Sequence, residues 1–317
     1  MTDTERDRIW PPLPFAEWKD TCATLHLWTQ IVGKVRLALT PWLNHSWHVT
    51  LYVTARGLTT SPIAHHANVF EIDFDFIDHL LIIRSSTSAE RTIALRPMTV
   101  AEFYEHLMSS LTELAYSVKI SAAPNEVEDA TPFSLDTKHA SYDRDHANRF
   151  WRVLLQSDRV FKEFRAPFIG KCSPVHFFWG SFDLAVTRFS GRTAPMHPGG
   201  VPHLPNAVAC EAYSHEVSSA GFWPGSEASP EPCFYSYAYP APAGFAEARV
   251  EPAAAFWHTA MREWMLPYDA VRTAESADAT LMQFLESTYA AAADLARWDR
   301  AALERRGAPL AFPQAHP

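Results

Sequence analysis

The stretch Phe70-Glu-Ile-Asp-Phe-Asp-Phe76 alternates strictly between apolar and acidic residues. Successive side chains of a β-strand point to opposite faces of the sheet, so this period of two predicts a strand with one face in a core and the other in contact with water. Strands of parallel sheets are usually buried on both faces and lack such alternation. The stretch therefore predicts an antiparallel sheet in this part of the chain.

The same alternation predicts further strands before and after this stretch, and helical spacing of apolar residues predicts helices between them. Thr99, with Glu102 three residues on, has the pattern of a capping box at the start of one helix. The chain is therefore expected to have an α+β fold. The other predicted strands lie at 35–39, 49–53, 92–95, 182–186, 211–219 and 233–239, and the other helices at 15–32, 143–165, 252–264 and 278–304.

The order of these elements is expected to repeat along the chain. Leu37-Ala-Leu-Thr40 matches Leu184-Ala-Val-Thr187 at an offset of 147 residues, and Phe70 matches Phe234 at an offset of 164. A proline- and glycine-rich insertion at 193–209 has the 17 residues that separate the two offsets. We therefore predict two pseudo-repeated halves, each of mostly antiparallel strands flanked by helices. Short matches of common residues also arise by chance, which is the alternative.

The predicted halves are packed as one compact domain with short extensions. The predicted boundaries are an N-terminal arm at 1–14, a first α+β unit at 15–120, a connector at 121–141, a second α+β unit at 142–306 and a C-terminal tail at 307–317.

Composition and charge exclude several classes of partner. The 317 residues are 47% hydrophobic and carry a net charge of −9, from 27 basic and 36 acidic residues. We found no basic run, so neither nucleic acid nor an acidic membrane surface is an expected partner. The N-terminus lacks the pattern of a secretory signal, no apolar run is long enough for a membrane helix, and the four cysteines form no C-x-x-C pair. These features predict a cytoplasmic protein.

Several strings of the sequence are familiar together. They are F-D-F-I-D-H at 74–79, G-K-C-S-P-V-H-F-F-W-G-S-F-D-L-A-V-T-R-F-S-G-R at 170–192, Y-S-H-E-V-S-S-A-G-F-W-P-G at 213–225 and L-P-Y-D at 266–269. Over nearly its whole length the chain resembles a bacterial family catalogued only as a domain of unknown function. The resemblance implies a bacterial cytosolic protein, but no activity and no catalytic residue.

Common catalytic motifs are incomplete in this chain. Gly170-Lys171-Cys172 lacks the first glycine and the final hydroxyl of a phosphate-binding loop, and His215-Glu216 lacks the second histidine of a zinc protease. Neither Gly-x-Ser-x-Gly nor Gly-x-Gly-x-x-Gly occurs. His45 and His48 could offer two imidazoles, but without a carboxylate nearby we predict no metal site. The cofactor and the oligomeric state stay open.

The segment from His176 to Arg192 is the strongest candidate for a site. Asp183 lies opposite the apolar face of its strand, and Arg188, Ser190 and Arg192 follow. The forked guanidinium of arginine suits a carboxylate or phosphate. We expect these residues beside the next strand, which begins near His215. The alternative is a buried pair of arginine and aspartate that only stabilises the fold.

Polar and aromatic residues also share the water-facing sides of the predicted strands. Tyrosines on one strand face, with acids and bases on neighbouring strands, are more typical of a lined pocket than of a solvated sheet. Alternatively, helices cover part of this face and the tyrosine hydroxyls reach its edge.

These residues predict an enzyme that acts on a small polar or anionic molecule in a pocket between the two halves, with the insertion as a lid. The alternative is a non-catalytic module that binds a small ligand or another protein. The candidate catalytic residues are His215, Glu216, Asp183 and His176, and the candidate ligand-binding residues are Lys34, His45, His48, Arg188, Ser190, Arg192, Tyr235 and Tyr237.

Overall fold

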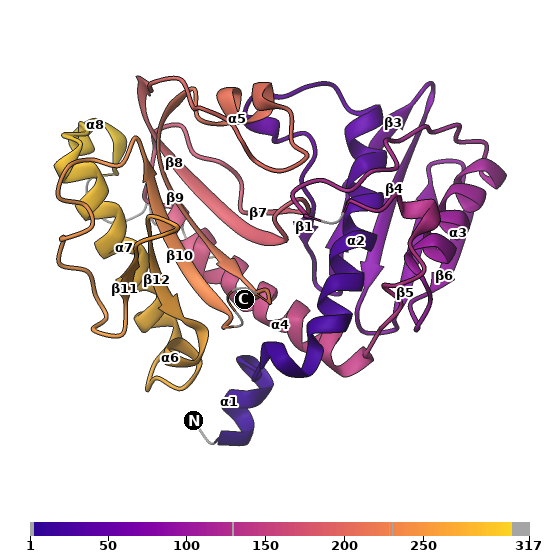
Figure 1. The fold of residues 1–317 in the computed structure, drawn as a ribbon, viewed down its shortest axis with the longest axis horizontal. Coiled ribbons are helices and arrows are strands. Elements are labelled where there is room, and N and C mark those ends of the chain that lie inside the picture. The colour runs from indigo at the N-terminus through magenta and orange to yellow at the C-terminus, as the bar shows by residue number, and fades with distance from the viewer. Residues whose placement is uncertain (1–2, 129, 228, 230, 306–317) are drawn as a thin grey trace, which may run out of the picture.

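Two antiparallel sheets of six strands each form the framework of the protein (Figure 1). The computed structural model describes residues 3–128, 130–227, 229 and 231–305, so the predicted tail at 307–317 lies outside the described residues. Helices precede and follow each sheet along the chain. This arrangement confirms the predicted α+β class.

The first sheet is formed by residues 52–94, with its strands in the order β1-β2-β4-β5-β6 and β3 paired to β4. The stretch that begins at Phe70 lies in β4, where Phe70, Ile72 and Phe74 are buried while Glu71 and Asp73 lie on the other face. The strands are β1 (Tyr52–Val53), β2 (Gly57–Thr59), β3 (Ile63–His65), β4 (Asn68–Asp75), β5 (Leu80–Ser85) and β6 (Glu90–Ala94).

The second sheet has the order β11-β12-β10-β9-β8-β7. Its longest strand, β8, alternates as the sequence predicts, and Leu184 and Val186 are fully buried. The register places Ala185 opposite Gly221 of β9. The strands are β7 (His176–Phe178), β8 (Asp183–Thr193), β9 (His215–Trp223), β10 (Cys233–Tyr239), β11 (Phe256–His258) and β12 (Glu263–Pro267).

Two long helices pack on one face of each sheet. Phe103 of α3 (Val100–Glu113) stacks on Trp28 of α2 (Phe15–Leu39) at 4.6 Å and lies 6.3 Å from Phe74 of the first sheet. In the second half, Phe161 of α4 (Arg144–Arg165) lies 6.2 Å from Phe234 of β10, and α7 (Ala277–Leu295) packs beside α4. Each sheet is therefore left with one face free of long helices.

The predicted capping box starts α3. The Thr99 hydroxyl accepts a hydrogen bond from the backbone N–H of Glu102 at 3.1 Å, and the Glu102 carboxylate accepts one from the backbone N–H of Thr99 at 2.7 Å. These bonds satisfy two N–H groups that have no partner within the helix. No helix of the described residues is long and apolar enough to cross a lipid bilayer.

Short helices complete the fold. The predicted N-terminal arm contains one of them, and Trp10, which follows it, is buried against Phe234 and Tyr268 of the second half. The short helices are α1 (Asp3–Ile9), α5 (Asn206–Ala212), α6 (Tyr268–Arg272) and α8 (Arg300–Leu303), with 3-10 turns η1 (Asn44–Ser46) and η2 (Phe133–Leu135).

The two sheets meet where each begins. Leu51, just before β1, and Phe177 of β7 form an isolated antiparallel bridge with hydrogen bonds of 2.9 and 2.8 Å. The apolar side chains of both halves belong to one main hydrophobic core cluster. The free face of the second sheet consequently lies next to α2 and η1 of the first half (Figure 1).

The predicted strand at 35–39 is wrong, because α2 continues to Leu39. Val35, Leu37 and Leu39 alternate with polar or small residues as in a strand, and Gly33 just before them is a residue that often follows the end of a helix. Gly33 instead lies within α2, where a side chain would come 2.1 Å from the indole nitrogen of Trp179. The glycine therefore makes room for tertiary packing and does not end the helix.

The predicted helix at 252–264 is also wrong. This segment contains β11 and the start of β12, which pairs with β10 through Trp264 and Ser236. The indoles of Trp257 and Trp264 pack together at 5.8 Å. Pairing with strands elsewhere in the chain overrode the local helical pattern, as it often does for edge strands.

The predicted duplication stays a prediction. Each half contains a long helix, a sheet of mostly consecutive strands and a second long helix, which is consistent with a repeat. The offset of 147 fails, because residues 37–40 lie at the end of α2 while residues 184–187 lie in β8. The offset of 164 pairs β4 with β10, so two of the matched residues do lie in strands.

Candidate functional site

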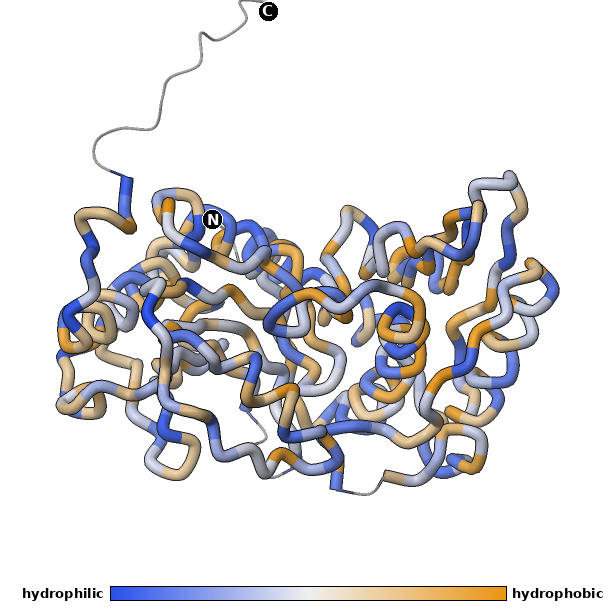
Figure 2. The backbone as a smooth tube through the Cα atoms, turned by 90° about the horizontal axis from the view of Figure 1, so that it is seen from above, coloured by the Kyte–Doolittle hydropathy of each residue, from blue (hydrophilic) through white to orange (hydrophobic). Residues whose placement is uncertain are grey.

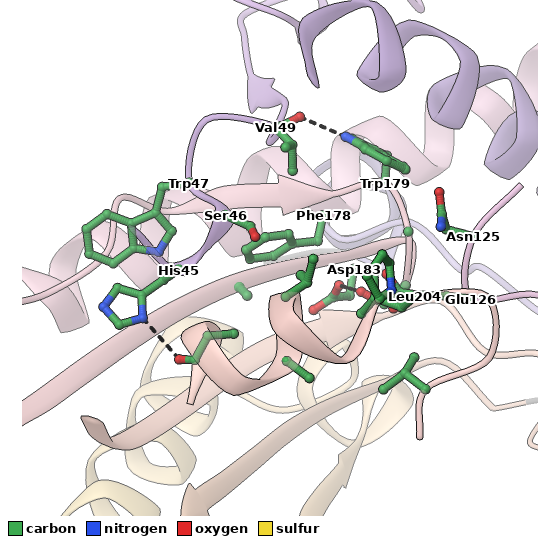
Figure 3. A pocket seen from close by; sticks show the side chains of 18 of the residues that line it. His45, Ser46, Trp47, Val49, Asn125, Glu126, Phe178, Trp179, Asp183 and Leu204 are labelled. Carbon is green, nitrogen blue, oxygen red and sulfur yellow. Dashed lines mark hydrogen bonds between the residues drawn. The ribbon is translucent and has the colours of Figure 1, made fainter. Parts of the chain in front are cut away.

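A cavity of about 680 Å³ lies on the free face of the second sheet, between the two halves (Figure 3). This is within the range of small-molecule sites in proteins, roughly 300–1,000 Å³. Its floor is formed by β8, β9 and β10, and one wall by α2 and η1. Its roof includes residues 121–126 of the connector, part of the proline- and glycine-rich insertion, and α5.

Strand alternation determines the floor of the cavity. Asp183 and Thr187 of β8 and Tyr235 of β10 point into it, while the intervening Leu184 and Val186 pack toward the helices. Hydroxyl groups connect neighbouring strands. The Oγ atoms of Thr187 and Ser219 lie 2.8 Å apart, and the phenolic oxygens of Tyr213 and Tyr237 lie 3.0 Å apart.

Asp183 is a buried carboxyl group without a positively charged partner among the described residues. Ser181 donates a hydrogen bond to its Oδ1 at 2.5 Å, and the Tyr235 hydroxyl donates one to Oδ2. Burial raises the pKa of Asp183, and these two hydrogen bonds lower it in part. Burial also raises the pKa of Tyr235 well above its usual value. The Tyr235 hydroxyl therefore keeps its proton and donates it in a hydrogen bond that orients the carboxyl group of Asp183.

Glu126 comes from the connector and lies in the same part of the cavity as Asp183 (Figure 3). Its carboxyl group has no hydrogen-bond or ion-pair partner among the described residues. Burial, and to a lesser extent the negative charge of Asp183, raise the pKa of Glu126 to about 7. Its Oε1 lies against the backbone of Gly180, where a Cβ would come within 2.0 Å. Gly180 therefore allows this carboxyl group to enter.

Glu263 of β12 resembles Glu126, although it does not line the cavity. Burial raises its pKa to about 7, with a further contribution from the charge of Asp183. The charge of Asp183 thus acts on both glutamates, and none of the three carboxyl groups has an arginine or lysine partner among the described residues. Acids in such a group hold protons at neutral pH more readily than ordinary surface acids.

Lys34 lies on the α2 wall, and only 3% of its surface is exposed. Its ammonium group donates to the side-chain oxygen of Asn125 and lies 5.7 Å from the ring centre of Trp179. No carboxylate of the described residues lies within ion-pair distance. Burial lowers the pKa of Lys34 to about 8. Asn125 in turn donates to the carbonyl of His203, which connects α2 to the insertion.

His45 lines the opposite end of the cavity, on η1 (Figure 3). Its Nδ1 lies 3.1 Å from the carbonyl oxygen of Ala212, and its Nε2 lies 2.5 Å from the ammonium group of Lys171. Nδ1 therefore carries the proton and Nε2 accepts from Lys171. Burial, and then the charge of Lys171, lower the pKa of His45. Its φ of 59° is in the left-handed region, where a side chain is strained.

The other predicted residues of the arginine-rich segment lie away from the cavity. Arg188 is buried on the helix side of the sheet, with its guanidinium 3.4 Å from the ring centre of Phe164 and 4.2 Å from that of Tyr289. It donates to the carbonyl of Phe164 and lies 3.5 Å from Glu286. Alternation places Arg188 on the same face as Leu184. The expected anion-binding role is therefore replaced by a role in packing.

Arg192 and Glu216 form an ion pair at 2.6 Å near the end of α7. Arg192 also donates to the carbonyl oxygen of Ala296, at the C-terminal end of α7, at 2.7 Å. Its positive charge is stabilised there by the negative end of the helix dipole. Ser190 accepts a hydrogen bond from the backbone N–H of Arg192. None of these three residues lines the cavity. Their contacts join the end of β8 to β9 and to the C-terminal end of α7, and they involve protein groups alone.

The remaining predicted histidines lie beside the cavity and not in its lining. His176 is fully buried, and neither ring nitrogen has a hydrogen-bond partner among the described residues. Burial lowers its pKa to about 3, so it stays neutral. His215 lies 6.1 Å from His45, ring centre to ring centre. The Nδ1 of His48 accepts from the backbone N–H of Leu43.

The structure thus brings five predicted residues to one cavity, and it adds Glu126, which the sequence reading missed. Glu126 lies in a polar segment that reads as a linker, and no local pattern distinguishes it from the neighbouring acids. Trp47 and Trp179 also line the cavity. Among the described residues no three His, Cys, Asp or Glu side chains are grouped as metal ligands. The predicted residues in the lining are Lys34, His45, Asp183, Tyr235 and Tyr237.

Comparison with known proteins gives a family and no activity. The model of a family of unknown function, DUF5996, matches residues 10–305, which is nearly the whole chain. The chain therefore belongs to this family, as the familiar strings predict. No curated protein and no solved structure matches the chain.

Proposed function

We propose that this member of the DUF5996 family is an enzyme that transfers protons to and from a small molecule held in the cavity between its halves. The observation that carries the proposal is the pair of carboxyl groups of Glu126 and Asp183, which share this cavity. Glu126 is the proton-transfer residue, and Asp183 is its neighbour on the cavity floor.

The chemistry of Glu126 supports this role. A general acid or base works best when its pKa is near the working pH, and burial raises the pKa of Glu126 to about 7. Its carboxyl group is also free of protein partners among the described residues, so it can bind a reacting group directly. Asp183 is held by Ser181 and Tyr235, which orient it and make it the less mobile of the two.

The second candidate function is binding without chemistry. It is supported by the aromatic lining, which includes Trp47, Phe178 and Phe189, and by the fixed hydrogen bonds of His45. Such walls give affinity but no reactive group. The proposed location is the cytoplasm, which is supported by the four unpaired cysteines.

A metabolite screen tests the proposal with two matched variants of α5. Val208 lines the cavity, and Ala207 beside it is exposed and does not. We expect metabolites that raise the melting temperature of the wild type to lose this effect in Val208→Trp and to keep it in Ala207→Trp. Equal binding by both variants would contradict a ligand site in the cavity.

Turnover of the binding metabolites separates the two candidate functions. Mass spectrometry should detect a product with the wild type, and Glu126→Gln should lower the rate at saturating metabolite concentration about a hundredfold or more. Binding without any product would support the non-catalytic module. A product formed equally fast by Glu126→Gln would exclude the proposed role of this carboxyl group.

A further inference from the structure

Lys34 is a buried cation with no carboxylate partner among the described residues. It is 97% buried, on the wall of the cavity, and its hydrogen-bond partner is the neutral side chain of Asn125. Removing an ammonium group from water costs several kcal/mol unless a counter-ion is present. The described residues supply no such counter-ion within 4 Å. A ligand that carries a negative charge would supply it.

The acidic part of the cavity lacks a positive charge. Glu126 and Asp183 have no cation partner among the described residues, and burial raises the pKa of both. They do not pair with Lys34, which belongs to a different wall and whose pKa is lowered by burial alone. A ligand with a basic nitrogen would stabilise the ionised form of these carboxyl groups and would itself stay protonated.

On the basis of the proposed function, we infer that the substrate is an amphoteric small molecule, with a carboxylate bound by Lys34 and an amino group bound by Glu126 and Asp183. Each end of such a molecule matches one uncompensated group of the cavity. Its apolar body would pack on the apolar lining of the cavity, which includes Phe178, Trp179 and Leu204 (Figure 3).

A monoanion fits this site better than a phosphate. Phosphate sites usually combine several cationic or backbone donors, and arginine forks are frequent in them. The lining contains one lysine and no arginine, because Arg188 and Arg192 lie elsewhere. Lys34 has one partner and three N–H donors, so two donors remain for the oxygens of a single carboxylate.

Three matched probes test this inference by calorimetry. para-(Aminomethyl)benzoate carries both charges, para-(aminomethyl)benzamide lacks the carboxylate, and para-toluate lacks the amine. A series of ω-aminoalkanoates from γ-aminobutyrate upward covers other separations of the two groups. We expect the amphoteric probes to bind, and the loss of either charged group to weaken binding about tenfold or more.

Variants assign each end of the probe to its residue. In Lys34→Met, para-(aminomethyl)benzoate and its benzamide should bind equally, and the affinity of the benzamide should match that of the wild type. In Glu126→Gln, the benzoate with the amine should bind no better than para-toluate. Binding of the benzamide by Lys34→Met, and of para-toluate by Glu126→Gln, also shows that each variant is folded.

Three outcomes would overturn the inference. The first is equal binding of the benzoate and the benzamide by the wild type. The second is an equal loss of all probes in Lys34→Met, which would mean that Lys34 only holds Asn125 in place. The third is the absence of binding across the whole probe series. If Val208→Trp still blocks binding of neutral metabolites in any of these cases, the proposed function stands while the amphoteric substrate does not.

Discussion

The two sheets of this protein share one plan and differ on their free faces. Both carry two long helices on one side. The free face of the first sheet carries ion pairs such as that of Arg84 with Asp73. The free face of the second sheet is covered by the insertion, α5 and the connector. Figure 2 shows the two halves from above, where polar and apolar segments alternate along the tube in both.

Two buried aspartates, one in each half, show how this difference affects the pKa of a carboxyl group. Asp75, at the end of β4, would have its pKa raised by burial, but the guanidinium of Arg56 and the backbone N–H groups of Asp78 and Ile77 lower it overall. Asp183, at the start of β8, has no cation near it, and its pKa is raised. The same residue type at a strand end is thus an anion in one half and favours the protonated acid in the other. Burial raises the pKa of both groups, and only at Asp75 do the partner residues outweigh it.

The largest expected difference between the two halves is in the free energy of unfolding when each aspartate is replaced by asparagine. At pH 7, Asp75→Asn should lower the free energy of unfolding by about 1–2 kcal/mol, because Arg56 loses its ion pair with Asp75 at 2.5 Å and keeps the one with Asp78. Asp183→Asn should change it by less than about 1 kcal/mol or increase it, because no cation loses a partner and the amide oxygen can still accept a hydrogen bond. Urea unfolding of both variants measures the difference.

The stability difference between the wild type and Asp75→Asn should depend on pH. The lowered pKa of Asp75 adds stability above its unfolded value near 4, which is lost as the pH falls through the folded pKa. The advantage of the wild type over Asp75→Asn should therefore shrink in acid. A larger loss for Asp183→Asn than for Asp75→Asn at pH 7 would contradict the role assigned to the partner residues.

A smaller effect is expected from Glu263 on the second sheet. Its folded pKa is raised from 4.5 to about 7, so the wild type should lose stability as the pH rises from about 4.5 to 7. Because the group keeps some contact with water, we expect this loss to be about 1 kcal/mol. Glu263→Gln should flatten the profile between these pH values. Parallel profiles for the wild type and the variant would show that Glu263 titrates normally.

The smallest effect on stability should come from Gly180→Ala. The added methyl group meets the mobile end of Glu126, not the backbone, so the unfolding free energy should change by less than about 1 kcal/mol. The carboxyl group must move outward, and its pKa should fall toward 4.5 as its burial decreases. NMR titration of Glu126 measures this pKa. An unchanged pKa would show that the contact with the backbone of Gly180 does not keep the Glu126 carboxyl group in the cavity.

Local patterns predicted much of the fold. The alternation in β4 and β8 and the capping box of α3 depend on neighbouring residues, and each was recognised. The errors at 35–39 and 252–264 came where contacts with distant segments determine the conformation. Arg188 was misplaced because β8 was taken to end before it, whereas the strand continues to Thr193.

The sequence by itself determined that Asp183, Tyr235 and Tyr237 face away from the apolar side of their sheet, because side-chain alternation is a property of the local backbone. Only the tertiary structure decided that this face is roofed while that of the first sheet is not. It also decided that Glu126 meets Asp183, 57 residues away along the chain, and that Lys34 has no counter-ion. Proximity across such distances results from packing of whole elements, which no short stretch of sequence encodes.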